Sequence, residues 1–303
     1  GNTGLTELEN FYMIVDQRVG LRTIAYEVRG IILLMATWDL VVVILYQVFH
    51  QEWMEQPSLP VSLIGSALAL FMGFRSNSAY ARWWEARTLW GAITNNCRSF
   101  GRQAGTLLGD RHDLMYAIAA YPHALRMALG KDDASADIAR LLPPPMLDAI
   151  ARYRNKPNAI LYQIGLGVAA EVSKKTIDGA VHGQIDRILS DIANAQGGLE
   201  RIRNTPLPIQ FSVLPRVLVN IFCIVLPLSM VQTLEWITPL GSSLVGCLFL
   251  VLDKSAKDLQ EPFSGTPHAL PMATMARGIE IDVIQPTGDQ TRPVLAPVRG
   301  IEI

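Results

Sequence analysis

Residues 57–87 read PSLPVSLIGSALALFMGFRSNSAYARWWEAR, and this stretch decides the fold. No charged residue occurs in it before Arg75. A helix over residues 57–74, rising ~1.5 Å per residue, covers most of a hydrocarbon core about 30 Å thick. Arginines and tryptophans follow at helical spacing, as is typical of the boundary between membrane and water. The stretch therefore predicts a membrane-spanning helix that passes into an amphipathic one.

The predicted span has two different faces. Its small residues recur every fourth position, which predicts close approach by another helix; they are Gly65, Ala69 and Gly73. The neighbouring stripe consists of Ser66, Leu70 and Phe74. We expect the first stripe to pack against protein and the second to line something.

The composition indicates a mixed protein. Of 303 residues, 50% are hydrophobic and 17% are charged, and the mean hydropathy is +0.25. Such a chain is too apolar for an ordinary soluble domain, so we expect membrane spans together with an aqueous domain. The net charge of −1 provides no basic field for a nucleic acid partner.

Features of enzymes and metal proteins are missing from the sequence. It contains no phosphate-binding loop, dinucleotide fingerprint or nucleophile elbow, and its five histidines are scattered. The three cysteines, Cys97, Cys223 and Cys247, have neither disulfide-framework nor metal-ligand spacing and are expected to be buried free thiols. We therefore expect no enzyme, no cofactor and no metal site.

Four apolar segments define the expected topology. The first covers 31–49 and contains Asp39, which should face protein or water because an acid is costly in lipid. The second is 57–74; two further spans, about 213–233 and 238–252, follow much later. The connection after the first span has Glu52 and Glu55 but no Lys or Arg, so it should lie outside, and the arginines after residue 74 should lie in the cytoplasm.

The domain boundaries follow from these segments. We expect an amphipathic N-terminal segment over 1–30, a first transmembrane hairpin over 31–74 and a second over 214–252. A cytosolic helical domain should cover 75–213, with helices at 80–108, 112–129, after Pro143–Pro145, at 158–172 and at 176–203. Cytosolic C-terminal helices at 253–285 and an extended tail at 286–303 complete the all-α prediction.

Three motifs in the chain resemble signatures of the bacterial branch of the bestrophin family. They are GFRSNSAYARWWEAR at 73–87, IRNTPLP at 202–208 and DLQEPF at 258–263. The resemblance implies a homopentamer around one central ion pore in a bacterial inner membrane. Four spans with both termini in the cytosol satisfy the Lys/Arg bias. By alignment the resemblance implies a hydrophobic neck at Ser66, Leu70 and Phe74. A cytosolic aperture falls near Ala180, with Ile177, Val181 and Gln184 as neighbours.

Two departures from the family pattern bear on the expected pore. Eukaryotic members have an acidic cluster after the Pro-Phe pair, whereas here Pro262-Phe263 leads into Ser264-Gly265. Calcium activation through that cluster is therefore not expected. Ser66 stands where a large apolar residue is usual, and Ala180 is small for an aperture, which predicts a wetter or wider pore.

The predicted function is a channel for small monovalent ions, with lipid, the permeating ions and copies of this chain as its partners. Glu52 and Glu55, repeated around an outer mouth, would concentrate cations and slightly favour them. Anion conduction, as in eukaryotic bestrophins, stays open. Two alternatives are a carrier with an intramembrane site at Asp39 and a membrane scaffold that conducts nothing.

Overall fold

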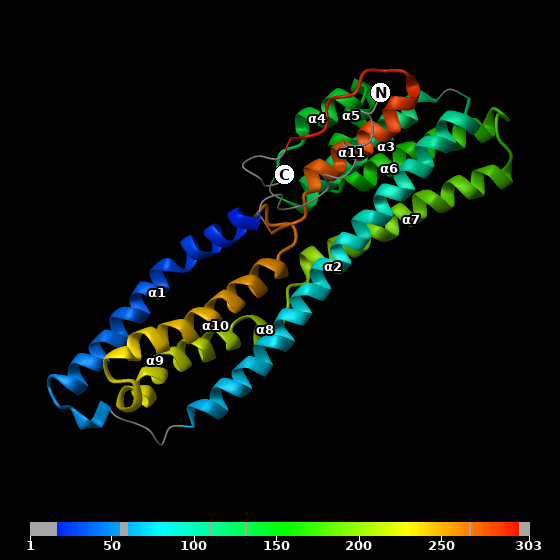
Figure 1. Cartoon of the computed structure of the whole chain (residues 1–303). Helices are drawn as coiled ribbons and strands as arrows, with labels where there is room; N and C mark the ends of the chain where they lie inside the picture. Colours follow the sequence, from blue (N-terminus) through cyan, green and yellow to red (C-terminus); the bar gives the residue numbers. More distant parts are fainter. Residues whose placement is uncertain (1–16, 55–59, 110, 131, 267, 297–303) are drawn as a thin grey trace, which may run out of the picture. The chain divides into compact units, whose positions relative to one another are not determined.

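The computed structural model describes residues 17–54, 60–109, 111–130, 132–266 and 268–296, and every regular element in these ranges is a helix (Figure 1). The all-α prediction is therefore confirmed for the described residues. In chain order the elements are α1 (Gln17–Gln47), η1 (Glu52–Met54), α2 (Val61–Leu107), α3 (His112–Leu129), α4 (Ser135–Leu141), α5 (Pro144–Ala151), α6 (Lys156–Ser173), α7 (Gly179–Asn204), α8 (Ile209–Ser212), α9 (Leu214–Leu234), η2 (Glu235–Ile237), α10 (Thr238–Gln260), α11 (Met272–Ile284) and η3 (Gln285–Thr287).

Helix continuity differs from the sequence-based boundaries in three places. The described part of the N-terminal segment, from Gln17, belongs to α1 and runs without a break into the first expected span. Helix α2 does not end at residue 74 but continues to Leu107, and α10 continues past residue 252 to Gln260. No proline lies at these junctions, so the change from apolar to polar residues does not by itself end the helix. The expected segment 1–16 lies outside the described residues.

The chain divides into two compact units, one of which contains the apolar helices. This unit consists of residues 16–83 and 206–260, so 31–74 and 214–252 belong to it. Within it α1 packs against α9 and α10, and α9 packs against α10. Its core joins Met35, Leu68, Met72, Phe222 and Leu250 from four helices. Gly246 in α10 has no room for a side chain, because the Met35 side chain of α1 fills that space.

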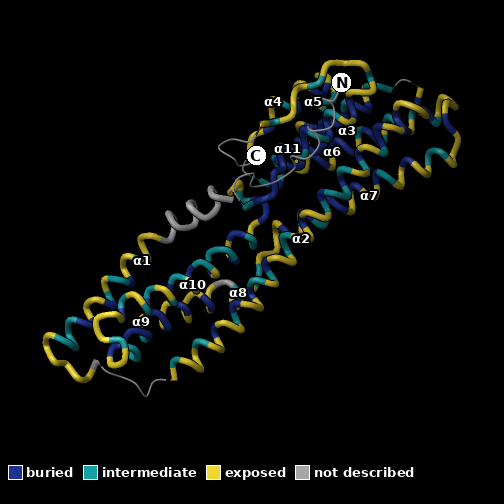
Figure 2. Tube along the Cα trace, in the orientation of Figure 1, coloured by how far each residue is buried: buried dark blue, intermediate teal, exposed yellow. Residues whose placement is uncertain are grey.

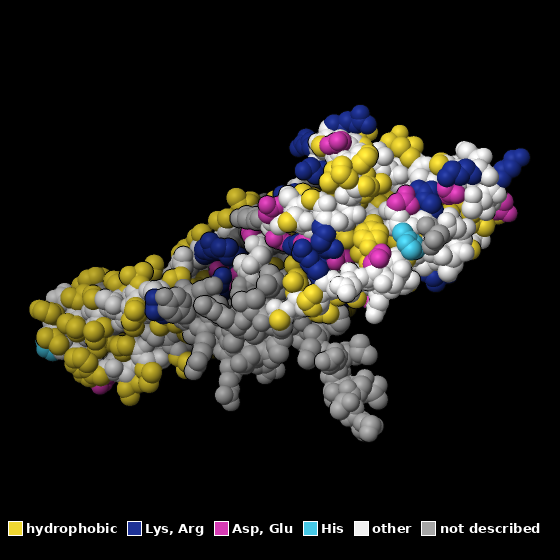
Figure 3. Space-filling view, turned by 90° about the horizontal axis from the view of Figure 1, so that it is seen from above, with side chains coloured by type: hydrophobic (Ala, Val, Ile, Leu, Met, Phe, Trp, Pro, Cys, Tyr) yellow, Lys and Arg dark blue, Asp and Glu magenta, His cyan; other side chains and the backbone are white. Residues whose placement is uncertain are grey.

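Two stretches of the described chain are long and apolar enough to cross a membrane: Arg29–Gln47, with a hydropathy of 1.9, and Ile209–Gln260, with 2.1. The second includes α8, α9 and α10. The expected span at 57–74 is not among them, because α2 begins at Val61. Its uncharged part, 61–74, rises by roughly 21 Å at ~1.5 Å per residue. On the face drawn in Figure 3, hydrophobic side chains gather over this apolar unit.

The second unit consists, within the described residues, of 84–205 and 261–296, and α3 is at its centre. Helix α3 packs against α4, α6, α7 and α11, and thirteen of its residues are buried (Figure 2). The prediction of a helix at 112–129 is confirmed residue for residue, and those at 158–172 and 176–203 agree within three residues. Residues 289–296 form no helix or strand, as expected for the tail predicted at 286–303, but its first two residues belong to η3.

Candidate functional site: the exposed stripe of α2 and the start of α7

One stripe of α2 is buried from Leu68 to Ala104. Its members recur every three, four or seven residues, and they are Leu68, Met72, Arg75, Ala79, Ala86, Trp90, Ile93, Cys97, Phe100 and Ala104. This periodicity places them on one face of an α-helix. Cys97 and Cys223 are buried free thiols, as expected, whereas Cys247 is a free thiol that is only half-buried.

The predicted neck residues lie on the other side of α2. Leu70 and Leu68 are two positions apart, about 200° around a helix with 3.6 residues per turn. Leu70 is 63% exposed and Phe74 57% exposed within the chain, and Ser66 is exposed as well. The Ser66 hydroxyl donates a hydrogen bond of 2.8 Å to the carbonyl oxygen of Ser62. It therefore presents only acceptor lone pairs outward.

The small-residue stripe was expected to pack against protein, and within the chain this is wrong for two of its three members. A side chain at Gly65 would meet the Phe222 ring at 3.3 Å, but Gly73 has nothing within 4 Å, and Ala69 is exposed. The packing face is the adjacent one, through Leu68 and Met72. Leu68 and Met72 form the packing face because larger apolar side chains bury more surface than Ala or Gly.

The predicted aperture residues lie at the start of α7, in the second unit. Ala180 and Gln184 are exposed and Val181 is half-buried, whereas Ile177 is only 7% exposed. The Asp178 side chain caps the helix by accepting a 2.8 Å hydrogen bond from the Val181 amide. Ala180 and Gln184, one turn apart, are therefore available to line an opening, while Ile177 anchors the turn.

A cavity of about 630 Å³ lies beside this turn. It is lined by the end of α2 and by the loop between α6 and α7, through Thr106, Leu107, Lys175, Thr176, Ile177, Asp178 and Val181. Lys175 has φ of +61°, which is uncommon for a residue with a side chain. The loop thus holds an unfavourable backbone conformation that its surroundings must stabilise.

Glu171 at the end of α6 supplies that stabilisation, and sequence reasoning missed it. Its carboxylate accepts hydrogen bonds from the Lys174 ammonium at 3.0 Å and from the Arg111 guanidinium at 2.5 Å. The bonds from Lys174, Thr176 and Arg111 lower the pKa of Glu171 from 4.5 to about 2. Arg111 lies 60 residues away in sequence, and nothing in the local pattern points to this contact.

Glu171 should therefore stabilise the loop only in its ionised form. Because its pKa is lowered in the folded protein, its contribution is complete above about 4.5 and is lost as the pH falls toward 2. We expect Glu171→Gln to speed amide hydrogen exchange at residues 174–178 at pH 7, and variant and parent to converge near pH 2. Asp113→Asn is the control, since Asp113 also binds Arg111, at 2.7 Å, but does not contact the loop. Equal exchange in all three proteins at pH 7 would refute this role.

The predicted outer mouth is described only in part. Glu52 is exposed at the start of η1, and Glu55 lies outside the described residues. No three His, Cys, Asp or Glu side chains within the described ranges are placed to hold a metal ion.

Asp39 in α1 is fully buried, and its two carboxylate oxygens accept separate hydrogen bonds from α10. Ser242 donates at 3.1 Å and Ser243 at 2.9 Å. This agrees with the expectation that an acid in the first span faces protein. Both oxygens are occupied by hydroxyl groups of a neighbouring helix, so the carboxylate ties α1 to α10.

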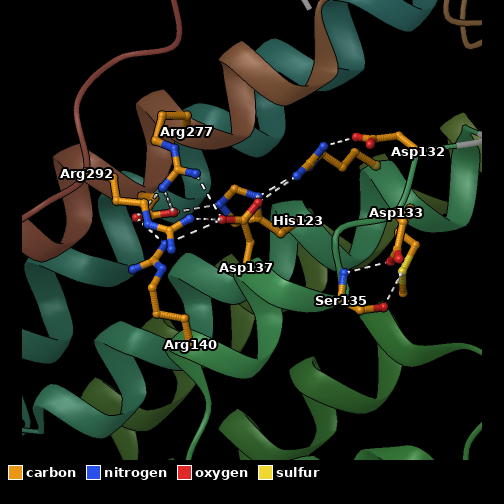
Figure 4. A network of polar contacts seen from close by, with 11 residues as sticks. His123, Asp132, Asp133, Ser135, Asp137, Arg140, Arg277 and Arg292 are labelled. Atoms are coloured by element: carbon orange, nitrogen blue, oxygen red, sulfur yellow. Dashed lines mark hydrogen bonds and ion pairs between the residues drawn. The ribbon is translucent and has the colours of Figure 1, made fainter.

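A larger polar cluster lies in the second unit, where α3, α4 and α11 meet (Figure 4). Glu280, 0% exposed, bonds His123 at 2.8 Å, Arg140 at 2.6 Å and Arg277 at 2.7 Å. Burial acts to raise the pKa of Glu280, but the His123 hydrogen bond and the two arginines outweigh it, so the pKa is lowered. Asp137 accepts from Arg277 at 2.9 Å and from Arg292 of the tail at 3.2 Å. These bonds join α3 and α4 to α11 and the tail, across separations of 140 to 157 residues in sequence.

Comparison with known proteins is consistent with this architecture of apolar helices and a charged helical unit. A family model for bacterial and fungal bestrophin proteins matches residues 16–285. A voltage-dependent anion channel-forming protein of Ralstonia nicotianae is 36% identical over 241 residues, covering 76% of this chain and 79% of the relative. A protein of the same description from Escherichia coli K12 is 33% identical over 229 residues, covering 75% of each chain.

The fold agrees with solved structures as well. A bacterial bestrophin homolog from Klebsiella pneumoniae superimposes with a TM-score of 0.81 at 31% identity, covering 86% of this chain and 98% of that chain. The protein is thus a membrane protein whose regular elements, in the described ranges, are all helices. It belongs to the bestrophin family, in the bacterial and fungal branch, as the three motifs predicted.

Proposed function

We propose that this chain is one subunit of a homopentameric channel that conducts small monovalent ions across a bacterial inner membrane. The observation that carries the proposal is the exposed stripe of Leu70 and Phe74, on an uncharged part of α2 whose opposite face is buried. Apolar side chains that are 63% and 57% exposed are costly beside water unless something covers them. Exposed apolar patches commonly mark functional surfaces.

Symmetry makes this stripe a pore lining. Four spans per chain are too few to enclose a central water path, so a cyclic assembly is needed, and it repeats each lining residue as a ring. Rings of Leu70 and Phe74 provide no ligands to an ion and can gate by dewetting. Ser66, one turn above Leu70, would add a polar ring, and Ala180 with Gln184 would surround the cytosolic aperture.

In this proposal each subunit crosses the membrane four times, at α1, the apolar part of α2, α9 and α10, with both termini in the cytosol. The arginines from Arg75 onward support that orientation through the positive-inside rule. Helix α2, with about 21 Å of uncharged rise, is the shortest span, which suits a helix that faces a pore more than lipid.

Two observations point to opposite charges for the permeant ion. Glu52 and Glu55 at the outer mouth favour cations, whereas the names of the curated relatives favour anions. A reversal potential measured in a single-salt gradient decides between them, because it follows the equilibrium potential of the permeant ion.

The carrier alternative makes a separate prediction at Asp39. A carrier with its binding site there would need that carboxylate free to meet its substrate, but both oxygens are bonded to Ser242 and Ser243. We expect Asp39→Asn to keep ion flux into proteoliposomes within about twofold of the parent, because an amide costs only part of one buried hydrogen bond, ~1 kcal/mol. Ser243→Ala is the matched control for packing. Flux abolished by Asp39→Asn and retained by Ser243→Ala would favour the carrier.

A further inference from the structure

Arg75, the residue directly after Phe74, is buried although it is charged. Its side chain is 1% exposed, and its guanidinium forms an ion pair with Asp253 of α10. Arg216 of α9 lies 3.6 Å from the other oxygen of Asp253. Within the described residues, the Arg75 Nε has no hydrogen-bond partner. A buried ion pair with an unsatisfied donor adds little net stability. The orientation that it imposes on α2 relative to α10 is therefore more informative than its energy.

A second arginine of α2 repeats the contact two turns further on. The Arg82 Nε donates a 2.9 Å hydrogen bond to the carbonyl oxygen of Gln260. Gln260 is the last residue of α10, where helix carbonyls lack intrahelical partners and a positive charge is favourable. Arg82 therefore caps the C-terminus of α10.

The two contacts share one spacing. Arg75 and Arg82 are seven residues apart, and so are Asp253 and Gln260. Seven residues make nearly two turns, so each pair lies on a single face of its helix. Arg75 contacts Asp253 and the later Arg82 contacts the later Gln260. These parts of α2 and α10 therefore run in the same direction. Together they form a two-point clamp, defined here as Arg75 and Arg82 with Asp253 and Gln260.

A two-point clamp fixes rotation in a way that apolar packing does not. The contacts of Leu68 and Met72 with the core are non-directional and tolerate small rotations, whereas a charge-assisted hydrogen bond has a preferred geometry. Successive helix residues differ by about 100°. Holding Arg75 against α10 therefore turns Phe74 away from the core, toward the side where it is exposed.

We infer that Arg75 and Arg82 are positioning residues for Phe74, and that α10, through Asp253 and Gln260, sets the rotation of α2 at the neck. This inference rests on the proposed function for its consequence in a channel, but its geometry is testable without ion flux. Lys254 and Asp258, 2.8 Å apart, form a charged pair between residues one turn apart within α10 itself.

The test measures how fast a charged, water-soluble methanethiosulfonate reagent labels Phe74→Cys in the purified full-length protein in mild detergent. Asp253→Asn should slow labelling by about threefold or more, within the range of coupling between contacting residues. The reason is that a released helix spends less time with position 74 facing outward. Asp253→Glu, which keeps the carboxylate, should stay near the parent rate. Protein with native Phe74 corrects for labelling of the natural cysteines.

Asp258→Asn is the matched control, since it makes the same change five residues along α10, at a site that is 8% exposed against 9% for Asp253. Equal labelling rates for Asp253→Asn and Asp258→Asn would overturn the inference. If Asp253→Asn does not assemble, Arg82→Met decides in the same assay, because methionine has no donor for the Gln260 carbonyl oxygen: slowed labelling supports the inference, and an unchanged rate overturns it. Parent protein without ion flux would refute the channel and leave the labelling result intact, so the two failures are distinguishable.

Discussion

Replacing Leu70 and Phe74 together by alanine is expected to raise ion conductance or open probability by about tenfold or more, which corresponds to removing only ~1.4 kcal/mol from the barrier. In a symmetric assembly the double substitution removes two apolar rings at once. A wider and less apolar constriction stays wetted, and a wetted constriction conducts. The measurement is current through planar bilayers containing the purified protein, normalised to the amount of protein incorporated.

A matched control is available on α10. Leu244 and Leu248 are also one turn apart and are 64% and 61% exposed. Leu244→Ala with Leu248→Ala removes a similar area of exposed apolar surface at positions that the proposal does not assign to the pore. We expect its currents to match those of the parent. If both double variants raise the current equally, or if neither does, the Leu70 and Phe74 stripe is not the neck.

Glu280→Gln is expected to destabilise the helical unit formed by residues 84–205 and 261–303 by about 3–5 kcal/mol, the cost of breaking a buried ion pair from one side. Glu280 is fully buried and bonds Arg140, Arg277 and His123, so the neutral amide leaves buried positive charge without compensation. Set against total stabilities of about 5–15 kcal/mol, this is a large fraction. At roughly 2–4 °C per kcal/mol, the thermal midpoint should fall by on the order of 10 °C.

Asp282→Asn, two residues along α11, is the control. It also removes a negative charge from an ion pair, but from an exposed pair instead of a buried one. Its ion pair with Arg98 joins side chains that are 39% and 50% exposed, and such pairs contribute about 0–1 kcal/mol. The thermal midpoint, followed by intrinsic tryptophan fluorescence in detergent, should hardly move in this variant. A Glu280→Gln protein that melts with the Asp282→Asn protein would show that the cluster in Figure 4 contributes no more than a surface ion pair.

Much of the fold could be predicted because helix signals in this chain are local. Helix α3 has apolar residues at helical spacing between a charged start and Gly130, and its observed bounds equal the predicted ones. Proline marked the start of α5 in the same way. The continuity of α2 was missed because the change from apolar to polar composition after Phe74 resembled an end. A helix ends where its backbone conformation changes, and no proline lies between Val61 and Leu107 to force that change.

The faces of α2 were harder to assign, and the reason is physical. Gly65, Ala69 and Gly73 have the pattern of a tight helix contact, but the stripe beside them, with Leu68 and Met72, buries more apolar surface and packs instead. The ion pairs could not be predicted from the sequence. Arg75 with Asp253 joins residues 178 positions apart, and His123 with Glu280 joins residues 157 apart. Only the tertiary fold brings such partners together.

The most direct test of the proposed function is single-channel recording from purified protein in a planar bilayer, with a tenfold gradient of one monovalent salt. The proposal predicts discrete unitary current steps with a reversal potential displaced from zero toward the equilibrium potential of the permeant ion. A carrier turns over too slowly to give resolvable steps, and a scaffold gives none. Bilayers that hold the assembled protein yet stay silent at every voltage would contradict the channel.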